Sequence, residues 1–420
     1  MFTFEAGALR GEVRVSGDKS ISHRALIFGA FASGRSLIEG ANRGADVLAT
    51  RDAILALGAR VDDRDSEIVV DGGALHNPAE TIDARNSGTT ARLLLGACAG
   101  HGIDARFDGD ASLRRRPMER VARYLRAMGA GVETSDGTLP ATVRGVATPP
   151  GRDFALDIPS AQLKSAILLA HLGATGTVRI SGDRFSRDHT ERMLRHFGRS
   201  ITFDGRTIEL EPGRLEARRV RIPADLSGAA FFLVAAAITP GSDITVRDAG
   251  VNPTRAGLLD ALRAMGADLD IVRERDLDGE PVADIRVRYR PLRATTISGE
   301  LVVRAIDEIP VLAVAAAHAA GTTSVRDAGE LRAKESDRLA AVGDILRRCG
   351  VKVVDRPDGF DVTGGGAHPP AQTLATEGDH RLAMSIAALA APTGAHAVDD
   401  ADCIAISFPE FVDRWSMAQA

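Results

Sequence analysis

The sequence is poor in cysteine and contains no long apolar run. Its three cysteines, Cys98, Cys349 and Cys403, form neither a CxxC pair nor a disulfide framework. We expect them to be buried small hydrophobic residues in a reducing cytoplasm. The longest apolar run, Ala229–Ile238, has ten residues, whereas a membrane-spanning helix needs about 20. The N-terminus has no basic region followed by an apolar stretch, so we expect no secretory signal.

Lysine is also scarce, because only four of the 52 basic residues are lysine. These are Lys19, Lys164, Lys334 and Lys352. Arginine cannot replace lysine as a compact point charge or as a proton-transfer group. The few lysines therefore point to positions where an ammonium group is needed, and three of them fall inside the motifs described below.

Several binding motifs are missing. The sequence has no P-loop, no GxGxxG opening a βαβ unit, no Cys/His cluster with zinc spacing and no GxSxG. The formal net charge of −5 over 420 residues is unlike that of a duplex-DNA binder. These absences are compatible with an enzyme that uses neither a metal nor a nucleotide.

The length suggests two or three domains or one repetitive architecture.

One phrase occurs six times along the chain. It consists of a polar turn, an Ala/Leu-rich helical run, a break containing glycine and an alternating strand-like run. The break glycines are Gly34, Gly102, Gly176, Gly241, Gly321 and Gly394. A second phrase such as LRAMGAGV follows five of the breaks and predicts a helix stopped by glycine, then a strand. The sequence therefore predicts six repeats of about 70 residues.

The two helices of each repeat differ in polarity. The first helices carry apolar residues on nearly every face, which is typical of buried helices, whereas the second carry Arg and Glu and are expected to form outer layers. We predict an α/β protein with two domains of three repeats each, with buried parallel helices inside and sheets outside. The sixth repeat lacks the second phrase, so the strand-like segment 2–15 is expected to complete it and bring both chain ends into one domain.

Polar residues collect at the starts of the six apolar helices. The segments are GDKSISHR (17–24), NSGTTAR (86–92), PSAQLK (159–164), DLSG (225–228), DEIP (307–310) and DHR (379–381). Helix N-termini bind anions through free N–H groups and a partial positive charge. Ser, Asp and Asn are also ordinary N-caps, but capping alone does not explain the accompanying Lys, Arg, Gln and Gly. We predict an anion-binding site for a ligand that carries phosphate, carboxylate or both.

Two further segments are rich in charge. RRRPM (114–118) is a basic loop before a predicted helix, and ELRAKESDR (330–338) would make Lys334 and Arg338 i,i+4 neighbours if it were helical. Solvated charge runs and surface salt bridges are the alternative interpretations of these segments. Because Asp307 lies in the same repeat, Glu335 could form a carboxylate pair with it for proton transfer.

Ten motifs occur here in the order of a known family. They are GDKSISHRAL (17–26), NSGTTARLL (86–94), RRPMERV (115–121), PSAQLKSA (159–166), SRDHTERML (186–194), NPTR (252–255), DEIPVLAVAAA (307–317), ELRAKESDRL (330–339), DHRLAM (379–384) and FPEF (408–411). Through them the chain resembles the 5-enolpyruvylshikimate-3-phosphate (EPSP) synthase family over essentially its whole length. The resemblance implies the two-domain enolpyruvyl transferase fold of six βαβαββ repeats. It places the domains at residues 14–222 and at 1–13 plus 223–420, with hinge crossings near 13–17 and 222–226.

The resemblance also implies a reaction. Phosphoenolpyruvate and shikimate 3-phosphate would give enolpyruvylshikimate phosphate and inorganic phosphate, a step of aromatic amino acid biosynthesis and the target of glyphosate. The 5-hydroxyl would add to C2 of the enol as C3 is protonated, and the tetrahedral intermediate would lose phosphate. No metal or other cofactor is implied. We expect a cytoplasmic monomer with no nucleic-acid or membrane partner.

By the same resemblance, roles are assigned to individual residues. The catalytic set is Lys19, Asp307 as base, Glu335 as proton donor and Lys334. The expected shikimate 3-phosphate site comprises Lys19, Ser20, Arg24, Ser160, Ala161, Gln162, Lys164, Arg187, Asp307 and Lys334. The expected phosphoenolpyruvate site comprises Lys19, Asn86, Gly88, Arg116, Gln162, Arg338 and Arg381. A departure is His189, which stands where some relatives have Tyr, and Gly88 is the small residue usual in glyphosate-sensitive members.

Two rival functions remain. The UDP-N-acetylglucosamine enolpyruvyl transferases share the fold but typically use a Cys on a mobile loop as proton donor, and no Cys lies in the anion motifs here. Six repeats could also form a non-enzymatic scaffold or a clamp, although a clamp around DNA would need a basic inner face. Charges at the helix starts together with two candidate acid–base carboxylates favour an enzyme.

Overall fold

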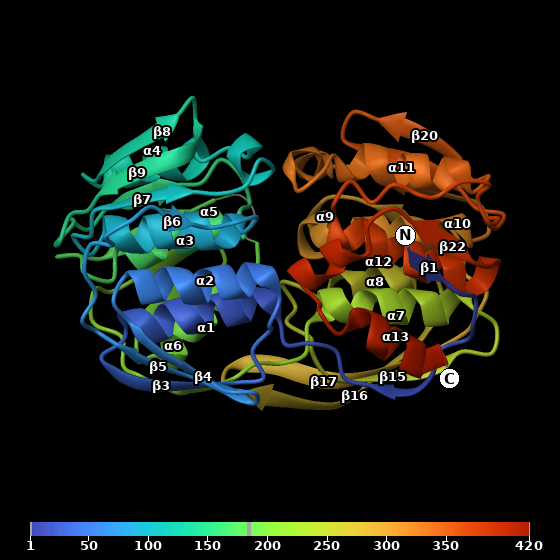
Figure 1. The fold of residues 1–420 in the computed structure, drawn as a ribbon, viewed down its shortest axis with the longest axis horizontal. Helices are drawn as coiled ribbons and strands as arrows, with labels where there is room; N and C mark the ends of the chain where they lie inside the picture. Colours follow the sequence, from blue (N-terminus) through green and yellow to red (C-terminus); the bar gives the residue numbers. More distant parts are fainter. Residues whose placement is uncertain (1, 183–185, 420) are drawn as a thin grey trace. The chain divides into compact units, whose positions relative to one another are not determined.

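The computed structural model describes residues 2–182 and 186–419. The chain divides into two compact units (Figure 1). Unit 1 comprises Met1–Asp18, Pro223–Asp276 and Pro281–Ala420, and unit 2 comprises Lys19–Ile222 and Leu277–Glu280. Within each unit the sheets lie on the outside and the apolar helices inside (Figure 1).

Each unit has three inner helices, which begin where the polar segments of the sequence predicted. Those of unit 2 are α1 (Lys19–Phe31), α3 (Gly88–Ala99) and α5 (Ala161–Ala170), and those of unit 1 are α7 (Leu226–Ile238), α10 (Ile309–Ala317) and α12 (His380–Thr393). The other helices are α2 (Ala45–Ala56), α4 (Glu119–Ala127), α6 (His189–His196), α8 (Gly257–Ala264), α9 (Glu300–Ala305), α11 (Arg338–Arg348) and α13 (Phe411–Gln419). Short 3₁₀ turns are η1 (Leu113–Arg115), η2 (Ile306–Glu308), η3 (Gly329–Ala333) and η4 (Asp402–Ile406).

Unit 2 contains three four-stranded mixed sheets. Their strand orders are β14 (Arg219–Arg221), β3 (Gly34–Glu39), β5 (Glu67–Gly72), β4 (Arg60–Asp63); then β6 (Ile82–Asp83), β7 (Ala105–Asp108), β9 (Thr138–Arg144), β8 (Gly131–Ser135); and β10 (Asp153–Ala155), β11 (Val178–Ser181), β13 (Thr207–Leu210), β12 (Ile201–Phe203). The first pair of each sheet is parallel and the other pairs are antiparallel.

Unit 1 repeats this arrangement twice and ends in a reduced sheet. The two full sheets are β2 (Arg10–Val13), β15 (Asp243–Gly250), β17 (Glu280–Arg288), β16 (Asp268–Leu277) and β18 (Thr296–Ile297), β19 (Thr322–Val325), β21 (Gly359–Thr363), β20 (Lys352–Arg356). The reduced sheet pairs β1 (Phe2–Phe4) with β22 (His396–Val398). Five four-stranded mixed sheets and the reduced sheet, all packed on helices, confirm the predicted fold class.

The sequence predicted that the whole N-terminal segment 2–15 completes the sixth repeat. The structure instead divides this segment between two repeats. Strand β1 pairs with β22 and does complete the sixth repeat. Strand β2, however, pairs in parallel with β15 and supplies the first strand of the fourth repeat. The first repeat is completed in the same way, because β14 from the end of the third repeat pairs with β3. The prediction for the whole segment 2–15 was therefore wrong for residues 10–13.

Glycines end the second helices as predicted. Gly58, Gly129, Gly198, Gly266 and Gly350 follow these helices, and all have φ between +81° and +102°. A residue with a Cβ is strained in this left-handed region, so glycine is the natural residue after the C-cap. The chain can thus turn sharply from each outer helix into the next strand.

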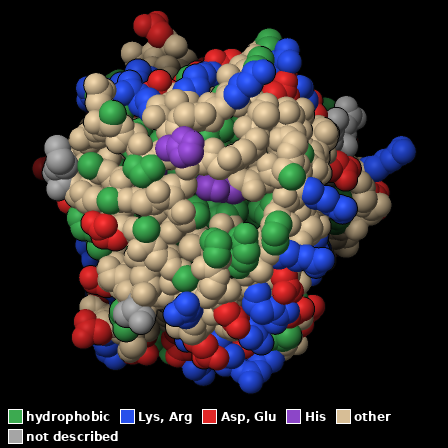
Figure 2. All heavy atoms as spheres, turned by 90° about the vertical axis from the view of Figure 1, so that its right-hand side faces the viewer, with side chains coloured by type: hydrophobic (Ala, Val, Ile, Leu, Met, Phe, Trp, Pro, Cys, Tyr) green, Lys and Arg blue, Asp and Glu red, His purple; other side chains and the backbone are tan. Residues whose placement is uncertain are grey.

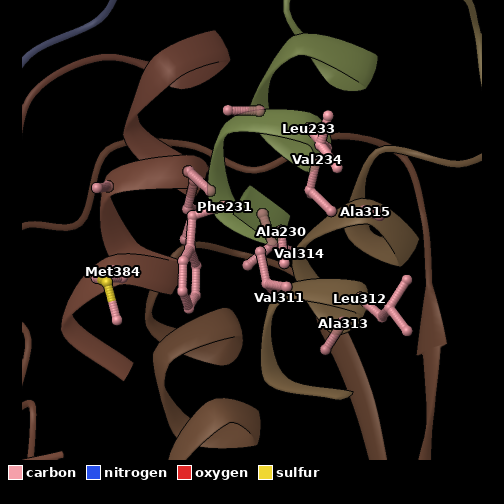
Figure 3. Packing of buried hydrophobic residues seen from close by; sticks show 14 of the residues in the cluster. Ala230, Phe231, Leu233, Val234, Val311, Leu312, Ala313, Val314, Ala315 and Met384 are labelled. Atoms are coloured by element: carbon pink, nitrogen blue, oxygen red, sulfur yellow. The ribbon is translucent and has the colours of Figure 1, made fainter. Parts of the chain in front are cut away.

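The core of unit 1 is built from helices that are apolar all round. Every residue of α7 is buried, and α7, α10 and α12 contact one another. Figure 3 shows Phe231 of α7, Val311 of α10 and Met384 of α12 in this packing. Burying a large apolar side chain contributes about 1.5–3 kcal/mol. These contacts fix the starts of the three helices, where the polar residues lie.

In unit 2 two glycines let α3 approach α5 closely. A Cβ on Gly96 would lie 2.4 Å from the carbonyl oxygen of Ala166, and one on Gly100 would lie 1.6 Å from that of Ala170. Neither distance can be accommodated without moving backbone. The C-terminal halves of the two helices are therefore held in close contact, and hydrogen bonds of Gln162 with Arg92 and Thr89 join the helices near their starts.

On the face that Figure 2 shows, Lys and Arg side chains lie among Asp and Glu side chains along the margins. No helix among the described residues is both long and apolar enough to cross a membrane.

Candidate active site

The predicted site residues fall into two groups, one in each unit. Unit 2 carries those numbered from Lys19 to Arg187, and unit 1 carries Asp307, Lys334, Glu335, Arg338 and Arg381. Each unit therefore has its own set of charged residues at the starts of its inner helices.

Lys19 is the first residue of α1 and forms an ion pair with Asp46. Its Nζ lies 2.8 Å from Oδ2 of Asp46, and the side chains are 15% and 8% exposed. Asp46 is in the first turn of α2, so the pair joins two helix starts. Asp46 lies outside every motif noted in the sequence, and no local pattern could have identified it as this partner.

Arg24 lies one turn into α1 and is buried by polar partners. Its Nη1 donates to the carbonyl oxygen of Ser20 at 2.8 Å, its Nε to Thr190 Oγ1 at 2.7 Å and its Nη2 to Ser165 Oγ at 2.8 Å. These contacts connect α1, α5 and α6. The guanidinium is thus held rigidly beside Ser20.

A second polar chain lies beneath these helix starts. His23 Nδ1 is 2.7 Å from Thr50 Oγ1, which is 2.6 Å from Thr90 Oγ1. Thr90 in turn donates to Ser87 Oγ at 2.7 Å. Burial, reinforced by the charges of Lys19 and Arg24, lowers the pKa of His23 well below its usual value. His23 is therefore a neutral support and not an additional cation.

Four of the residues expected to bind phosphoenolpyruvate gather at the start of α3. We call them, together with Arg92, the α3 cluster: Asn86, Gly88, Arg92, Arg116 and Gln162. Arg116 Nη2 donates to Asn86 Oδ1 at 2.6 Å, and Arg92 Nη1 donates to Gln162 Oε1 at 2.6 Å. A Cβ on Gly88 would lie 2.9 Å from Nη1 of Arg92 and 3.4 Å from Nη1 of Arg116. Two guanidinium groups therefore lie beside one helix N-terminus.

The sequence had not singled out Arg92. It stands four residues after Gly88 in the NSGTTAR motif, so one helical turn brings it back to the helix start. That spacing was the available signal. By contrast, Arg114 of the basic loop forms an exposed pair with Asp108, so the surface interpretation holds for Arg114 while Arg116 is 7% exposed.

The start of α5 is capped by Ser160, whose side chain accepts a hydrogen bond from the backbone N–H of Leu163 at 3.3 Å. Ala161 is the first residue of the helix. Lys164, one turn further, is 1% exposed, and its Nζ lies 2.5 Å from Glu191 Oε1. The same Nζ donates to the carbonyl oxygens of Ser186 at 3.2 Å and Arg187 at 2.9 Å. Lys164 thereby holds the segment that carries Arg187.

In unit 1 three cations surround Asp307. Its Oδ1 lies 3.5 Å from Lys334 Nζ and 3.4 Å from Arg338 Nη1, and its Oδ2 lies 4.0 Å from Arg381 Nη2. Asp307 is in η2, directly before α10, and is 9% exposed. The structure therefore brings four of the predicted residues together around one carboxylate.

Arg338 connects the remaining acidic groups. It is 1% exposed, and it lies 2.7 Å from both Glu335 Oε2 and Asp379 Oδ2. Burial opposes ionisation of Asp379, but the charge of Arg338 outweighs it and lowers the pKa of Asp379. Asp379 also caps α12, because its Oδ1 accepts from the backbone N–H of Arg381 at 2.9 Å. We call Asp307, Lys334, Glu335, Arg338, Asp379 and Arg381 the Asp307 cluster.

The charged segment 330–338 is not one continuous helix. Lys334 and Arg338 are not i,i+4 neighbours on a helix, because η3 ends at Ala333 and α11 begins at Arg338. The break arises at Asp337, whose side chain accepts from the backbone N–H of Ala340 at 3.1 Å and caps the new helix. Arg338 is also buried, so the surface salt-bridge interpretation does not apply to it.

The described residues show no arrangement of three or more His, Cys, Asp or Glu side chains that could hold a metal ion. The groups available at the site are therefore helix N-termini, guanidinium and ammonium cations, and a few carboxylates. Such a set can bind anionic ligands and transfer protons between them.

Comparison with known proteins identifies relatives across the whole chain. The family model described as EPSP synthase (3-phosphoshikimate 1-carboxyvinyltransferase) matches residues 5–415. The 3-phosphoshikimate 1-carboxyvinyltransferase of Citrifermentans bemidjiense is 46% identical over 416 residues, which cover 97% of this chain and 96% of that protein. The enzyme of the same name from Gloeobacter violaceus is 48% identical, over 97% and 96%.

Solved structures agree with these matches. EPSP synthase from Acinetobacter baumannii superposes with a TM-score of 0.87 at 39% identity, covering 99% of this chain and 98% of that one. The enolpyruvyl transferase NikO from Streptomyces tendae has a TM-score of 0.77 at 20% identity, covering 99% and 96%. At 20% identity, this match shows that NikO and the chain share a fold.

Proposed function

Because the chain belongs to the EPSP synthase family, we propose that its α3 cluster and its Asp307 cluster bind the anionic substrates and move the protons of that family's reaction. The chain is an enolpyruvyl transferase, and it transfers the enolpyruvyl group of phosphoenolpyruvate to shikimate 3-phosphate. The proposal concerns the residues that bind each substrate and the residues that move each proton.

Phosphoenolpyruvate is bound by cations that the fold holds in place. Arg116 is oriented by Asn86, and it lies beside the N-terminus of α3, where Gly88 leaves room for an anion. Lys19, paired with Asp46, adds a positive charge at the start of α1. In unit 1, Arg338 and Arg381 supply further guanidinium groups, which suit carboxylate and phosphate oxygens.

Shikimate 3-phosphate is bound through the start of α5 and the residues around it. The hydroxyl of Ser160 and the backbone N–H group of Ala161 supply donors for the phosphate. Lys164 contributes its charge and holds the Arg187 segment through two carbonyl oxygens. Ser20 and Arg24 hold the carboxylate, and Gln162 contacts the ring.

Asp307 accepts the proton of the attacking 5-hydroxyl. Three cations lie within 4.0 Å of its carboxylate oxygens, so the ionised form is favoured. A carboxylate held ionised can accept a hydrogen bond from the hydroxyl and orient its lone pair toward C2. Lys334, the nearest ammonium group, then passes protons and balances charge.

Glu335 donates a proton to the C3 methylene. The Glu335 side chain is 15% exposed, and it shares the charge of Arg338 with Asp307 and Asp379. Arg338 lowers the pKa of Asp379 in spite of its burial, and Asp307 faces three cations. We therefore assign proton donation to Glu335.

The observation that carries this proposal is the placement of Asp307 among Lys334, Arg338 and Arg381. The test is phosphate release from phosphoenolpyruvate in EDTA, with shikimate 3-phosphate or UDP-N-acetylglucosamine as acceptor. We expect phosphate release when shikimate 3-phosphate is the acceptor and none when UDP-N-acetylglucosamine is the acceptor. We also expect a loss of about 10²–10⁴-fold in kcat for Asp307→Asn and for Glu335→Gln. Full activity of Glu335→Gln would remove its role as proton donor, and release with the nucleotide sugar alone would overturn the acceptor-site assignments.

The cysteines argue against the nucleotide-sugar reaction. Burial raises the pKa of the Cys98 and Cys403 thiols to about 12 and that of Cys349 to about 11. A thiol buried in this way is neither accessible nor easily ionised. The proposal therefore assigns proton donation to a carboxyl group.

The cytoplasmic location and the monomeric state expected from the sequence also remain proposals. The named relatives are bacterial enzymes, and all three thiols are free and buried. Light scattering after size exclusion would test the monomer, and an apparent mass of twice 44.2 kDa would contradict it.

A further inference from the structure

A buried polar network in unit 1 lies behind Arg381 and has no part in the reaction described above. It consists of Ser227 at the start of α7, Arg255 from the NPTR motif before α8, and Glu308 directly before α10. Arg255 and Glu308 are 3% and 1% exposed. Groups so deeply buried need mutual compensation.

The NPTR motif forms the turn that presents Arg255. Asn252 Oδ1 accepts from the backbone N–H of Thr254 at 3.0 Å and from Thr254 Oγ1 at 2.8 Å. The backbone N–H of Arg255 then donates to the carbonyl oxygen of Asn252 at 2.8 Å. This local turn lets the Arg255 side chain reach the starts of α7 and α10.

Arg255 and Glu308 form a buried ion pair. Nη1 of Arg255 lies 2.8 Å from Oε2 of Glu308, and Nη2 donates to Ser227 Oγ. Burial opposes the charge of Arg255, but Glu308, Asp225 and Asp307 outweigh it and raise its pKa. Both partners are therefore ionised.

Ser227 links this pair to Arg381. Its hydroxyl donates to Glu308 Oε1 and accepts from Arg255 Nη2 and from Arg381 Nη1, the last at 3.0 Å. A hydroxyl has one donor hydrogen and two acceptor lone pairs, so its whole capacity is used. Asp225 fixes the backbone of this serine, since its Oδ1 accepts from Ser227 N–H at 2.8 Å.

One end of the Arg381 guanidinium is thereby held. Nη1 donates to Ser227 Oγ and to the carbonyl oxygen of Asp307, each at 3.0 Å, and lies 3.5 Å from Glu308 Oε1. Among the described residues, the hydrogen bonds of the Arg381 side chain are all made by Nη1, and Nη2 lies 4.0 Å from Asp307 Oδ2. The network thus fixes Nη1 and leaves the opposite edge for a ligand.

We propose that Arg255 is a positioning residue, which acts with Glu308 and Ser227 to hold Nη1 of Arg381 so that the Nε–Nη2 edge meets the phosphoenolpyruvate anion. Arg255 also neutralises Glu308. Without it, Glu308 would draw the Arg381 guanidinium toward itself and away from the ligand. This inference rests on the proposed role of Arg381 in binding phosphoenolpyruvate.

The variants Ser227→Ala, Arg255→Met and Arg255→Met/Glu308→Met test the proposal in the full chain. We expect the KM for phosphoenolpyruvate to rise about tenfold or more in Ser227→Ala and in Arg255→Met, with the KM for shikimate 3-phosphate changed by less than about twofold. The double variant should recover much of that loss, because Glu308 then no longer draws Arg381 away while Ser227 and the carbonyl oxygen of Asp307 still hold Nη1. Ser242→Ala, which removes a buried hydroxyl that accepts from Leu9 N–H elsewhere in unit 1, is the control and should leave both constants unchanged.

Three outcomes would overturn the inference. One is an unchanged KM for phosphoenolpyruvate in Ser227→Ala, which is the smallest change and the one to use if Arg255→Met does not fold. Another is an equal rise in both KM values, which a general structural defect would produce. The third is a double variant no better than Arg255→Met. Arg381→Lys is measured alongside: if it leaves the KM for phosphoenolpyruvate unchanged, the proposed role of Arg381 fails and the inference with it.

Discussion

The buried pair of Lys164 and Glu191 offers a direct test of how unit 2 is held together. The side chains are 1% and 5% exposed, and 2.5 Å separates Nζ from Oε1. Lys164→Met would leave the Glu191 carboxylate buried without its cation, and it would remove the donor of two carbonyl oxygens, those of Ser186 and Arg187. Breaking a buried pair from one side costs about 3–5 kcal/mol.

That free energy converts into a measurable shift. For a unit of this size about 1 kcal/mol corresponds to roughly 2–4 °C, so Lys164→Met should lower the melting temperature of unit 2 by roughly 6–20 °C. Lys164→Met/Glu191→Leu removes the orphaned charge and should recover about 2 kcal/mol, because only the two carbonyl oxygens then lack their donor. Recovery of stability without recovery of shikimate 3-phosphate binding would separate the two roles of Lys164.

The assay can distinguish the units. The only tryptophan, Trp415, lies in unit 1, so its fluorescence follows unit 1, whereas far-ultraviolet circular dichroism follows both units. The variant should show a dichroism transition that precedes the loss of native Trp415 fluorescence. Equal melting temperatures for the single and the double variant would refute the reasoning, since the cost would then not come from the unpaired carboxylate.

Three further changes have definite expected results. Gly88→Ala would place a Cβ 2.9 Å from Nη1 of Arg92, and because only the end of a flexible side chain must move, we expect a raised KM for phosphoenolpyruvate with an unchanged melting temperature; an unchanged KM would contradict this. Gly100→Ala would place a Cβ 1.6 Å from the carbonyl oxygen of Ala170, so α3 and α5 must separate, and urea denaturation should show a loss of about 3 kcal/mol or more; stability within about 1 kcal/mol of the parent would show that the helices part easily. Burial lowers the pKa of His318 from 6.5 to about 4. Between these pH values the unfolded chain binds a proton that the folded chain does not, so stability falls as the pH falls through this window. The difference in melting temperature between about pH 7 and about pH 4.5 should be smaller for His318→Leu than for the parent, and equal differences would count against this assignment.

The repeat and the helix starts could be predicted because they depend on local patterns. Glycine after each outer helix and a polar turn before each inner helix are visible in the sequence itself, and both occur where expected. Asp307 with Glu335 could be proposed because the motifs of one repeat carry both residues. The helix starts and the glycine stops concern residues whose conformation is decided by their neighbours in the chain, whereas the roles of Lys19, Lys334 and the arginines came from the family resemblance.

The buried ion pairs could not be predicted in this way. Arg255 and Glu308 are 53 residues apart, and Lys19 and Asp46 are 27 apart. Nothing in the periodicity states which helix start faces which. The same holds for β2, because its pairing with β15 joins segments more than 200 residues apart and is chosen by tertiary packing.

The pairing of Phe2–Phe4 with His396–Val398 has a consequence for synthesis on the ribosome. At about 5–20 residues per second, the first strand emerges roughly 20–80 s before its partner is made. All strands that pair within the three sheets of unit 2 lie between Gly34 and Arg221, so these sheets can form while the rest is still being translated. Strand β1 is thus among the last strands to pair, and nascent unit 1 must keep it from pairing elsewhere until β22 has been made.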